Sequence, residues 1–310
     1  MLDSEPPRFL CRLGGSDTNA LAALLTDQMQ QTPDSRKQLE YHRGMVQKFN
    51  GYYDLAQDWD KFVRYLDVLM ACYKGAKYLS FCGFQLLQIY FQEDVPEAER
   101  KEKVFGRAEI ERLTAAIDAA GQNPVCVPYG FIEKITRHHY SLFHLLAKVL
   151  PGKRVLVVSP FAESIELNFA NRMQFFKDFA YPDFTLLTTN TPVTYSGLPP
   201  SYYPHADWFE TTEALIADVS AQDFDIALLS CGSYALPIGH HIEHVLKRRA
   251  IYVGGVLQLF FGIMGRRYQN KFFTDPINED AFIFPVEGPR LLQHVDISPE
   301  TRREAFGAYF

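Results

Sequence analysis

The fold is decided by Phe224-Asp-Ile-Ala-Leu-Leu-Ser-Cys-Gly-Ser-Tyr-Ala-Leu-Pro-Ile-Gly239, which runs on to Ala250-Ile-Tyr-Val-Gly-Gly-Val-Leu-Gln258. The apolar run 226–229 does not alternate and stops before Gly232, and the next one stops at Gly254-Gly255. Such runs are typical of buried parallel strands that feed helices. Ligands of open α/β sheets bind at the carboxyl ends of strands. The two glycine-marked ends therefore predict one crevice, which we expect to bind an anion.

The remaining chain repeats this alternation of strand-like and helix-like segments, which favours an α/β fold. No repeat or composition shift marks a boundary. We expect one Rossmann-like domain over 1–310, with a mostly parallel sheet, helices on both faces and extra helices within about 35–150. The irregular segment 189–207 is either a linker or a functional loop. The other expected strands are 8–13, 77–83, 124–128, 154–159 and 184–188; the expected helices include 107–120, 131–149, 163–178 and 207–222, and an amphipathic helical region over 35–76 broken at 50–54.

Composition narrows the class of protein. The 310 residues are 47% hydrophobic, enough to bury a large core. The net charge of −6 gives no support to bulk electrostatic binding of nucleic acid. The first seven residues lack the features of a secretory signal, and the longest apolar stretches are too short to span a membrane. Five scattered cysteines without CxxC spacing fit a reducing, cytoplasmic setting.

The first strand ends in a motif suited to binding phosphate, Arg12-Leu-Gly-Gly-Ser-Asp17. Gly14 and Gly15 permit close backbone approach before a helix, and Arg12 could form a forked contact with phosphate. The alternative is an ordinary turn in which Ser16 or Asp17 caps the helix and Arg12 lies on the surface.

The two later glycine turns offer further candidates. Gly254 and Gly255 could present N–H groups to a phosphate or a ribose, and Gln258 could hydrogen-bond the ligand; close helix–strand packing also calls for glycine. Gly232 is followed by Ser233 and Tyr234, which are either donors to the ligand or a turn serine with a packed tyrosine.

Other candidates are single charged residues. Arg267 could clamp a phosphate or complement a helix dipole. Glu163, at another strand end, is the first candidate for a base, although acidic residues are common at helix starts without chemistry. Weaker candidates are Asp54, Asp207 and Glu210. His240 and His244 share a helical face, but no third metal ligand is evident, and we expect a solvated face from which His240 could touch the ligand.

Three patches together resemble the GT-D-type bacterial glycosyltransferases, which are Rossmann-like enzymes that use nucleotide sugars. They are Arg12–Asp17, which looks like the family's Arg-x-Gly-Asp-Gly-Glu or Arg-x-Gly-Gly-x-Glu motif, then Lys153–Ser164, and third Ser230–Pro237 with Ala250–Arg267. The resemblance implies a cytoplasmic glycosyltransferase that moves a sugar, expected from a UDP-sugar, to a glycan acceptor in surface-polysaccharide or glycoconjugate synthesis. It leaves peripheral membrane association and the oligomeric state open.

The resemblance also implies roles for residues. Asp17 or Glu163 would act on the acceptor hydroxyl, and the donor would be bound by Arg12, Gly14, Gly15, Gly232, Ser233, Tyr234, Gly254, Gly255, Gln258 and Arg267. Family members with an Asp-x-Glu pair associate it with a divalent metal. Here Gly15 replaces the first acid, so Mn²⁺ or Mg²⁺ would rest on Asp17 and the substrate's phosphates.

Two alternatives from other classes stay open. Loss of the acid at Gly15 would suit a non-catalytic module that binds a nucleotide sugar. A methyltransferase or dehydrogenase of the same fold class is a further alternative, although the first strand is not followed by G-x-G-x-x-G, which disfavours a dehydrogenase.

Overall fold

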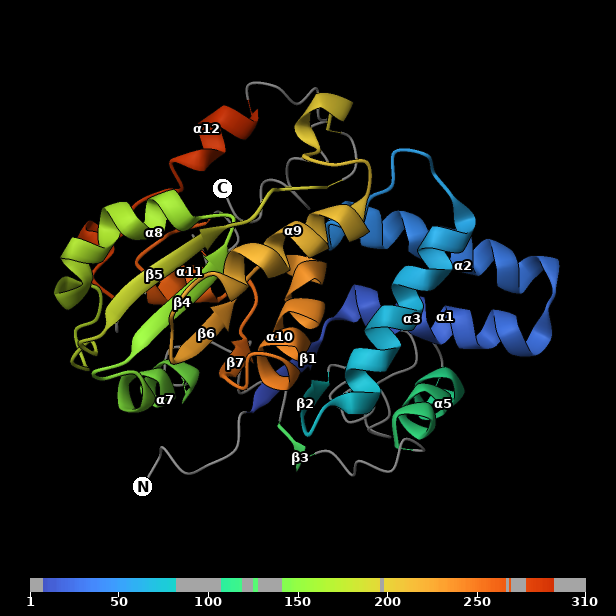
Figure 1. Ribbon diagram of the computed structural model, residues 1–310, viewed down its shortest axis with the longest axis horizontal. Coiled ribbons are helices and arrows are strands. Elements are labelled where there is room, and N and C mark those ends of the chain that lie inside the picture. Colours follow the sequence, from blue (N-terminus) through green and yellow to red (C-terminus); the bar gives the residue numbers. More distant parts are fainter. Residues whose placement is uncertain are drawn as a thin grey trace, which may run out of the picture.

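A seven-stranded, all-parallel sheet forms the centre of the protein (Figure 1). The computed structural model describes residues 8–81, 107–118, 125–127, 141–195, 198–265, 268 and 277–292. The order of the strands is β3-β2-β1-β7-β6-β4-β5. Their bounds are β1 Phe9–Leu13, β2 Tyr78–Phe81, β3 Val125–Cys126, β4 Arg154–Ser159, β5 Thr185–Asn190, β6 Ile226–Leu229 and β7 Arg249–Tyr252. The predicted α/β class is therefore confirmed.

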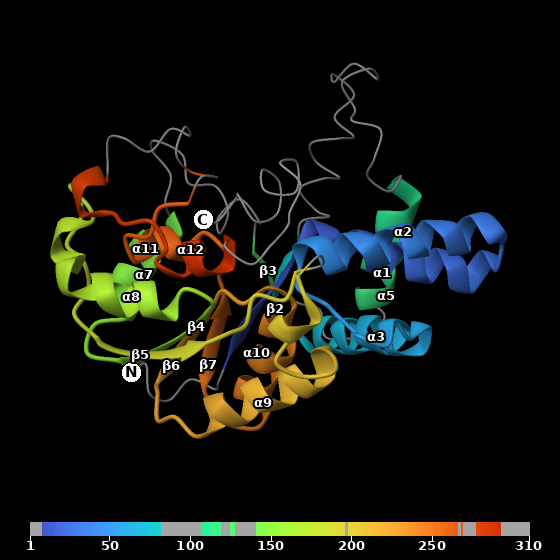
Figure 2. The ribbon, with the colours of Figure 1, turned by 90° about the horizontal axis from the view of Figure 1, so that it is seen from above.

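Helices cover both faces of this sheet (Figure 2). On one face lie α1 (Gly15–Gln30), α3 (Trp59–Gly75), α9 (Trp208–Ser220) and α10 (Ala235–His244). The other face is covered by α7 (Ser141–Val149), α8 (Ala162–Asn168) and the short α11 (Leu257–Phe260). The remaining described helices are α2 (Pro33–Phe49), α5 (Arg107–Asp118), α12 (Glu287–Leu292) and the 3₁₀ turns η3 (Phe169–Gln174), η4 (Pro200–Tyr202), η5 (Gly232–Tyr234) and η6 (Glu279–Ala281).

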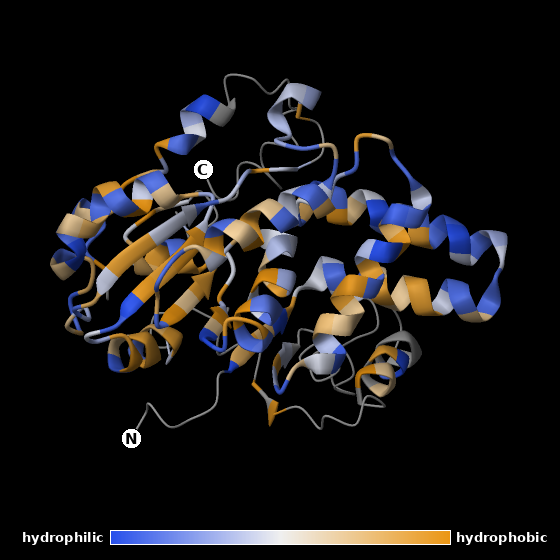
Figure 3. Ribbon diagram, in the orientation of Figure 1, coloured by the Kyte–Doolittle hydropathy of each residue, from blue (hydrophilic) through white to orange (hydrophobic). Residues whose placement is uncertain are grey.

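The apolar runs of the sequence account for this layering. In β4, Leu156 and Val158 belong to one core cluster, and Val155 and Val157 belong to the other. Successive side chains of a strand point to opposite faces, so a strand that is covered on both faces must be apolar at every position. Figure 3 shows the consequence, since the central strands are mostly hydrophobic along their length.

The described helices within the predicted extra helical region, about 35–150, are α2, α3, α5 and α7. The first of them, α2, forms with α1 a long pair of helices that extends beyond the sheet (Figure 1). The chain breaks between them at Thr32, whose hydroxyl accepts a hydrogen bond from the Ser35 amide at 3.1 Å while Ser35 Oγ accepts from the Thr32 amide at 3.1 Å. This capping box, with Pro33 at the first helical position, fixes the start of α2.

Several sequence expectations need correction. The helix predicted over 163–178 is split into α8 and η3, and Gly14 rather than Ser16 or Asp17 occupies the N-cap position of α1. The helical part of 131–149 is described only from Ser141, and the charged stretch 92–103 lies outside the described residues. None of the described helices is long and apolar enough to cross a membrane.

Candidate functional site

The strands β1 and β7 are neighbours in the sheet, and the helices that follow them, α1 and α11, cover opposite faces. The carboxyl ends of two such strands form the kind of crevice in which an α/β sheet binds ligands. From β1 the chain moves outward to β2 and β3 on one side, while β7 pairs with β1 on the other. The turn at Gly14 and the turn at Gly254 therefore lie at neighbouring strand ends. Gly232, at the end of β6, is one strand further along.

Arg12 and Gly254 meet across this junction. Arg12 is only 7% exposed; its Nη1 lies 3.5 Å from the carbonyl oxygen of Val253, and its guanidinium carbon lies 5.4 Å from the ring centroid of Tyr252. Gly254 has φ +75°, and a Cβ there would fall 1.8 Å from Arg12 Nη1. Glycine is therefore needed both for the backbone conformation and for the space that the guanidinium fills. Two predicted binding residues from opposite ends of the chain are brought together.

The N-terminus of α1 opens beside Arg12. Gly14 is extended and has no side chain to cap the helix, and the first helical bond runs from the Thr18 amide to the Gly14 carbonyl at 2.9 Å. The amides of the first turn have no intrahelical partner, and the helix dipole adds partial positive charge there. None of the described residues lies within 4 Å of the position that a Cβ on Gly15 would take, so this end has space beside it in the described part of the chain.

Asp17 lies in the first turn of α1 with its carboxylate buried, at 1% exposure. Oδ1 accepts hydrogen bonds from the side-chain amide of Asn50 and from the hydroxyl of Tyr65 at 3.3 Å. Burial raises the pKa of Asp17 to about 6, and the bonds from Asn50 and Tyr65 and the nearby Arg12 limit the rise. Oδ2 has no hydrogen-bond partner among the described residues.

Asn50 is a site residue that sequence reasoning missed, because an Asn-Gly pair is typical of a break between helices. The backbone carbonyl of Asn50 accepts a hydrogen bond from the Ser233 amide at 2.9 Å. A Cβ on Gly232 (φ +59°) would lie 2.6 Å from that backbone oxygen. The turn therefore joins the end of β1, through Asp17, to the end of β6. The Asn50-Gly51 pair was the available signal, but its partners are remote in sequence.

The side chains of Ser233 and Tyr234 are both buried and hydrogen-bonded within the protein. The Ser233 hydroxyl accepts a hydrogen bond from Trp208 Nε1 at 2.8 Å, and the Tyr234 hydroxyl lies 2.7 Å from Thr194 Oγ1. Both side chains are almost fully buried. A turn serine with a packed tyrosine, one of the two alternatives, describes what their side chains do. Trp208, at the end of the irregular segment, is likewise part of the core.

Gln258 is buried on α11, three residues after Gly255. Its Nε2 donates to the Ile263 carbonyl at 3.4 Å, and its Oε1 has no partner among the described residues. Arg267 lies outside the described residues.

Glu163 is placed differently from Asp17. It lies in the first turn of α8, half-exposed, and both its oxygens bind Arg290 of α12, at 2.7 and 2.9 Å. Nothing in this arrangement directs Glu163 to the junction of β1 and β7, and its contacts are those of a surface ion pair.

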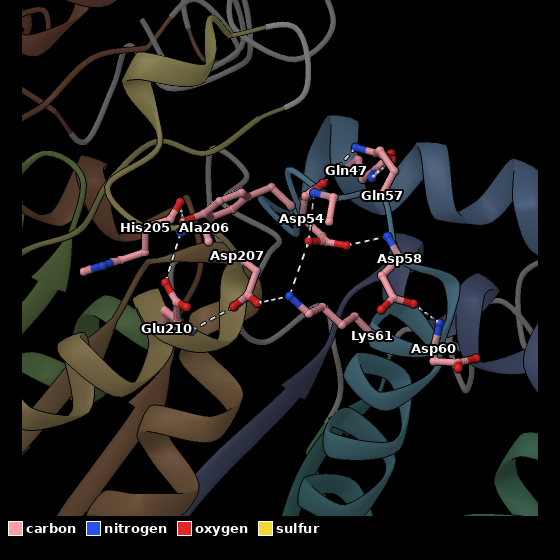
Figure 4. Close-up of polar contacts among 12 residues, drawn as sticks. Gln47, Asp54, Gln57, Asp58, Asp60, Lys61, His205, Ala206, Asp207 and Glu210 are labelled. Carbon is pink, nitrogen blue, oxygen red and sulfur yellow. Dashed lines mark hydrogen bonds and ion pairs between the residues drawn. The ribbon is translucent and has the colours of Figure 1, made fainter.

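Asp54, Asp207 and Glu210 form a structural network (Figure 4). Asp207 Oδ1 caps α9 by accepting from the Glu210 amide at 3.0 Å, and its Oδ2 lies 2.5 Å from Lys61 Nζ. Asp54 Oδ2 accepts from the Asp58 amide at 2.5 Å. Lys61 Nζ also lies 3.7 Å from Asp54 Oδ1, so the two aspartates hold the α2–α3 connection and α3 against the start of α9. Glu210 Oε2 accepts from the Ala206 amide at 3.1 Å, just before that helix. All three carboxylates therefore have structural partners.

The histidines of α10 lie against one another and against a serine of α9. The rings of His240 and His244 are 4.3 Å apart between centroids, and His241 Nε2 lies 3.0 Å from Ser220 Oγ. In the part of the chain that the structure describes, no three His, Cys, Asp or Glu side chains come together as metal ligands would.

Among the described residues, the junction offers a divalent cation one open carboxylate oxygen, Asp17 Oδ2, which would need the substrate's phosphates to complete the shell. Asp17 supplies one carboxylate, and the oxygen that carries its hydrogen bonds faces donors, namely an amide NH₂ and a phenol. Mg²⁺ and Mn²⁺ need oxygen lone pairs around them, not N–H or O–H hydrogens. Comparison of the chain with protein-family models, curated proteins and solved structures finds no significant match. The GT-D resemblance stays a prediction.

Proposed function

We propose that this protein transfers a sugar from a nucleoside diphosphate sugar, a UDP-sugar in the first instance, to a glycan acceptor. The observation that carries the proposal is the position of Arg12 against Gly254 at the neighbouring carboxyl ends of β1 and β7. A buried arginine beside two glycine turns and an uncapped helix N-terminus is suited to a diphosphate.

The chemistry requires that this cradle stabilise a leaving group. As the bond between the anomeric carbon and the diphosphate oxygen breaks, the electron pair and the negative charge move onto the diphosphate. Arg12 offers a fork of N–H donors, and the first-turn amides after Gly14 offer further donors with the positive end of a dipole. Because these groups are fixed before the reaction, they stabilise the charge without reorganising.

Asp17 is the better of the two candidate bases. In a single displacement, the acceptor hydroxyl gives its proton to the carboxylate while its oxygen bonds to the anomeric carbon. Oδ2 is free of protein hydrogen bonds among the described residues, and a pKa of about 6 leaves the group ionised at neutral pH. The carboxylate of Glu163, by contrast, forms an ion pair with Arg290 on the surface.

A second candidate is a module that binds the nucleotide sugar without turning it over. Gly15 favours it, because the acid that family members carry there is missing. The two candidates share the binding site and differ only in catalysis.

The test is thermal unfolding and sugar-nucleotide hydrolysis with a panel of UDP-sugars and with UDP alone. We expect UDP to raise the melting temperature and the correct donor to be slowly hydrolysed. Stabilisation by UDP with no turnover for any donor and glycan acceptor would instead favour the binding module. No stabilisation by any nucleotide would overturn the proposal.

A matched pair of variants locates the site. Gly254→Ala and Gly152→Ala both place a side chain on a left-handed backbone, with φ +75° and +70°. Only at Gly254 does the new methyl group collide with Arg12, since none of the described residues lies within 4 Å of the Cβ position at Gly152. We expect Gly254→Ala to weaken UDP binding by about tenfold or more, measured by calorimetry, and Gly152→Ala to leave it unchanged.

A further inference from the structure

The hydroxyl of Ser80 is a buried polar group that the fold leaves without a partner. Ser80 lies one residue before the end of β2, and its side chain is fully buried. Its Oγ has no hydrogen-bond partner among the described residues. A buried hydroxyl of this kind costs free energy, because it has lost its bonds to water and gained none from the protein. Such groups are few in native proteins, and a functional role or an ordered water is the usual explanation.

Ser80 is the neighbour of Arg12 across the β1–β2 pair (Figure 1). The two strands are parallel, and Arg12 is paired directly with Ser80 in their register. Paired residues of neighbouring strands point to the same face of the sheet, with their Cα atoms about 5 Å apart. Arg8 and Tyr78 confirm that face, because each is an even number of positions from this pair and the Arg8 guanidinium carbon lies 5.4 Å from the Tyr78 ring centroid. Ser80 therefore lies next to Arg12 near the carboxyl ends of the strands.

Ser80 and Arg12 together suit an anionic oxygen. A serine hydroxyl can donate one hydrogen bond, and bonds to charged acceptors are roughly twice as strong as neutral ones. Burial strengthens such a bond, since the local dielectric constant is lower than that of water. The oxygen of Gln258, which also has no partner among the described residues, is different because a carboxamide oxygen only accepts. It would repel a phosphate oxygen, so the additional side-chain donor is on the β2 side of Arg12.

We infer that Ser80 is a binding residue, which donates its hydroxyl hydrogen to an oxygen of the ligand's diphosphate while Arg12 binds the same group; this rests on the proposed function for its ligand. The bound diphosphate would give the buried hydroxyl the acceptor that the described fold does not supply. Ser80 leaves no signal in the sequence, because a serine within a strand-like run marks neither a turn nor a motif.

The test compares Ser80→Ala with Thr191→Val, since each variant deletes a buried hydroxyl. Thr191 follows β5, which is the edge strand at the opposite end of the sheet from β2 and β3, and its Oγ1 likewise has no partner among the described residues. We expect both variants to melt at the wild-type temperature or above it, because neither loses a hydrogen bond of the free protein. Ser80→Ala should bind UDP about tenfold or more weakly by calorimetry, and Thr191→Val should bind it as the wild type does.

Inorganic pyrophosphate provides a second measurement, because it carries the diphosphate without the nucleoside. We expect Ser80→Ala to lose affinity for pyrophosphate by a factor similar to that for UDP. A loss confined to UDP would place the hydroxyl at the nucleoside and overturn the inference, as would an equal loss of UDP affinity in Thr191→Val.

Equal UDP affinity in the wild type and Ser80→Ala would also overturn the inference, and is the result expected if an ordered water is the only partner of the hydroxyl. Each of these three outcomes leaves the proposed function standing. A wild-type protein that binds neither UDP nor pyrophosphate overturns the proposed function and this inference with it.

Discussion

The buried carboxylate of Asp17 makes folding stability depend on pH. Its pKa is raised from 3.8 to about 6 in the folded protein, because burial disfavours the charged form. The folded state therefore holds this proton more tightly than the unfolded state between these values. Stability from this group is fully present below about pH 4 and falls as the pH rises through 6, by about 3 kcal/mol in total.

Asp17→Asn should remove this dependence. We expect the difference in unfolding free energy, wild type minus variant, to fall by about 3 kcal/mol between pH 4 and 7, measured by urea denaturation. The difference must be used, because the pKa of His42 is lowered to about 4 by burial and gives the wild type a slope of opposite sign. A difference that stays constant across this range would show that Asp17 is not buried as described.

Part of the site can be predicted at the residue scale. Arg12, Gly14 and Gly254 stand out because glycines at strand ends leave a local trace in the sequence. Asn50 and Tyr65 do not, since each meets Asp17 through the fold, from 33 and 48 positions away. Glu163 follows a strand end, which is also where a catalytic base would lie. Its ion pair with Arg290, which the sequence does not reveal, distinguishes it from such a base.

At the scale of elements, the packing of α10 against β1 depends on one glycine. A Cβ on Gly239 would lie 2.2 Å from the ring of Phe9, which is buried on β1. The helix can approach the strand this closely only where no side chain intervenes.

Gly239→Ala should therefore destabilise the fold, by about 1 to 3 kcal/mol, as overpacked cores do. Gly44→Ala on α2 is the matched control, because its Cβ position has no neighbour within 4 Å in the described part of the chain. There the gain in helix propensity should stabilise by about 0.5 to 1 kcal/mol. Chemical denaturation of the two variants checks both signs, and a neutral Gly239→Ala would contradict the close contact.

The strands were easier to predict than the ends of helices. A short apolar run that does not alternate is typical of a strand covered on both faces, and each expected strand has a counterpart in the sheet. The helix expected over 163–178 fails for a tertiary reason: Asn168, which ends α8, donates its side-chain amide to the carbonyls of Gly262 and Ala281 at 3.0 and 3.1 Å. Such a contact with a distant segment overrides local helix propensity.

At the scale of the whole molecule, the amino ends and the carboxyl ends of the parallel strands differ in the contacts that their arginines make. Arg154 begins β4, at the amino ends of the strands, and binds Asp225 at 2.9 Å and also Asp223. Arg12 lies near the carboxyl ends of the strands, beside the glycine turns, and contacts the Val253 carbonyl. Ligands of α/β sheets bind at the carboxyl ends, so Arg12 and not Arg154 lies at the expected position.

We expect Arg154→Ala to lower the melting temperature and leave UDP affinity unchanged. Arg12→Gln should weaken UDP binding by about tenfold or more, because the amide cannot supply the charged fork. Calorimetric titration of both variants with UDP decides the matter. Equal losses of affinity in the two would place the ligand elsewhere.

The pairing of β1 with β7 also sets the order in which the protein can be assembled. Arg12 and Val253 are 241 residues apart in sequence, so the ribosome takes on the order of 10 to 50 s to deliver the second after the first. Until then β1 has an open edge, which is the kind of edge that pairs with other chains. The junction that we propose as the ligand site is therefore one of the last contacts to form, and ligand binding there would report that the central sheet is complete.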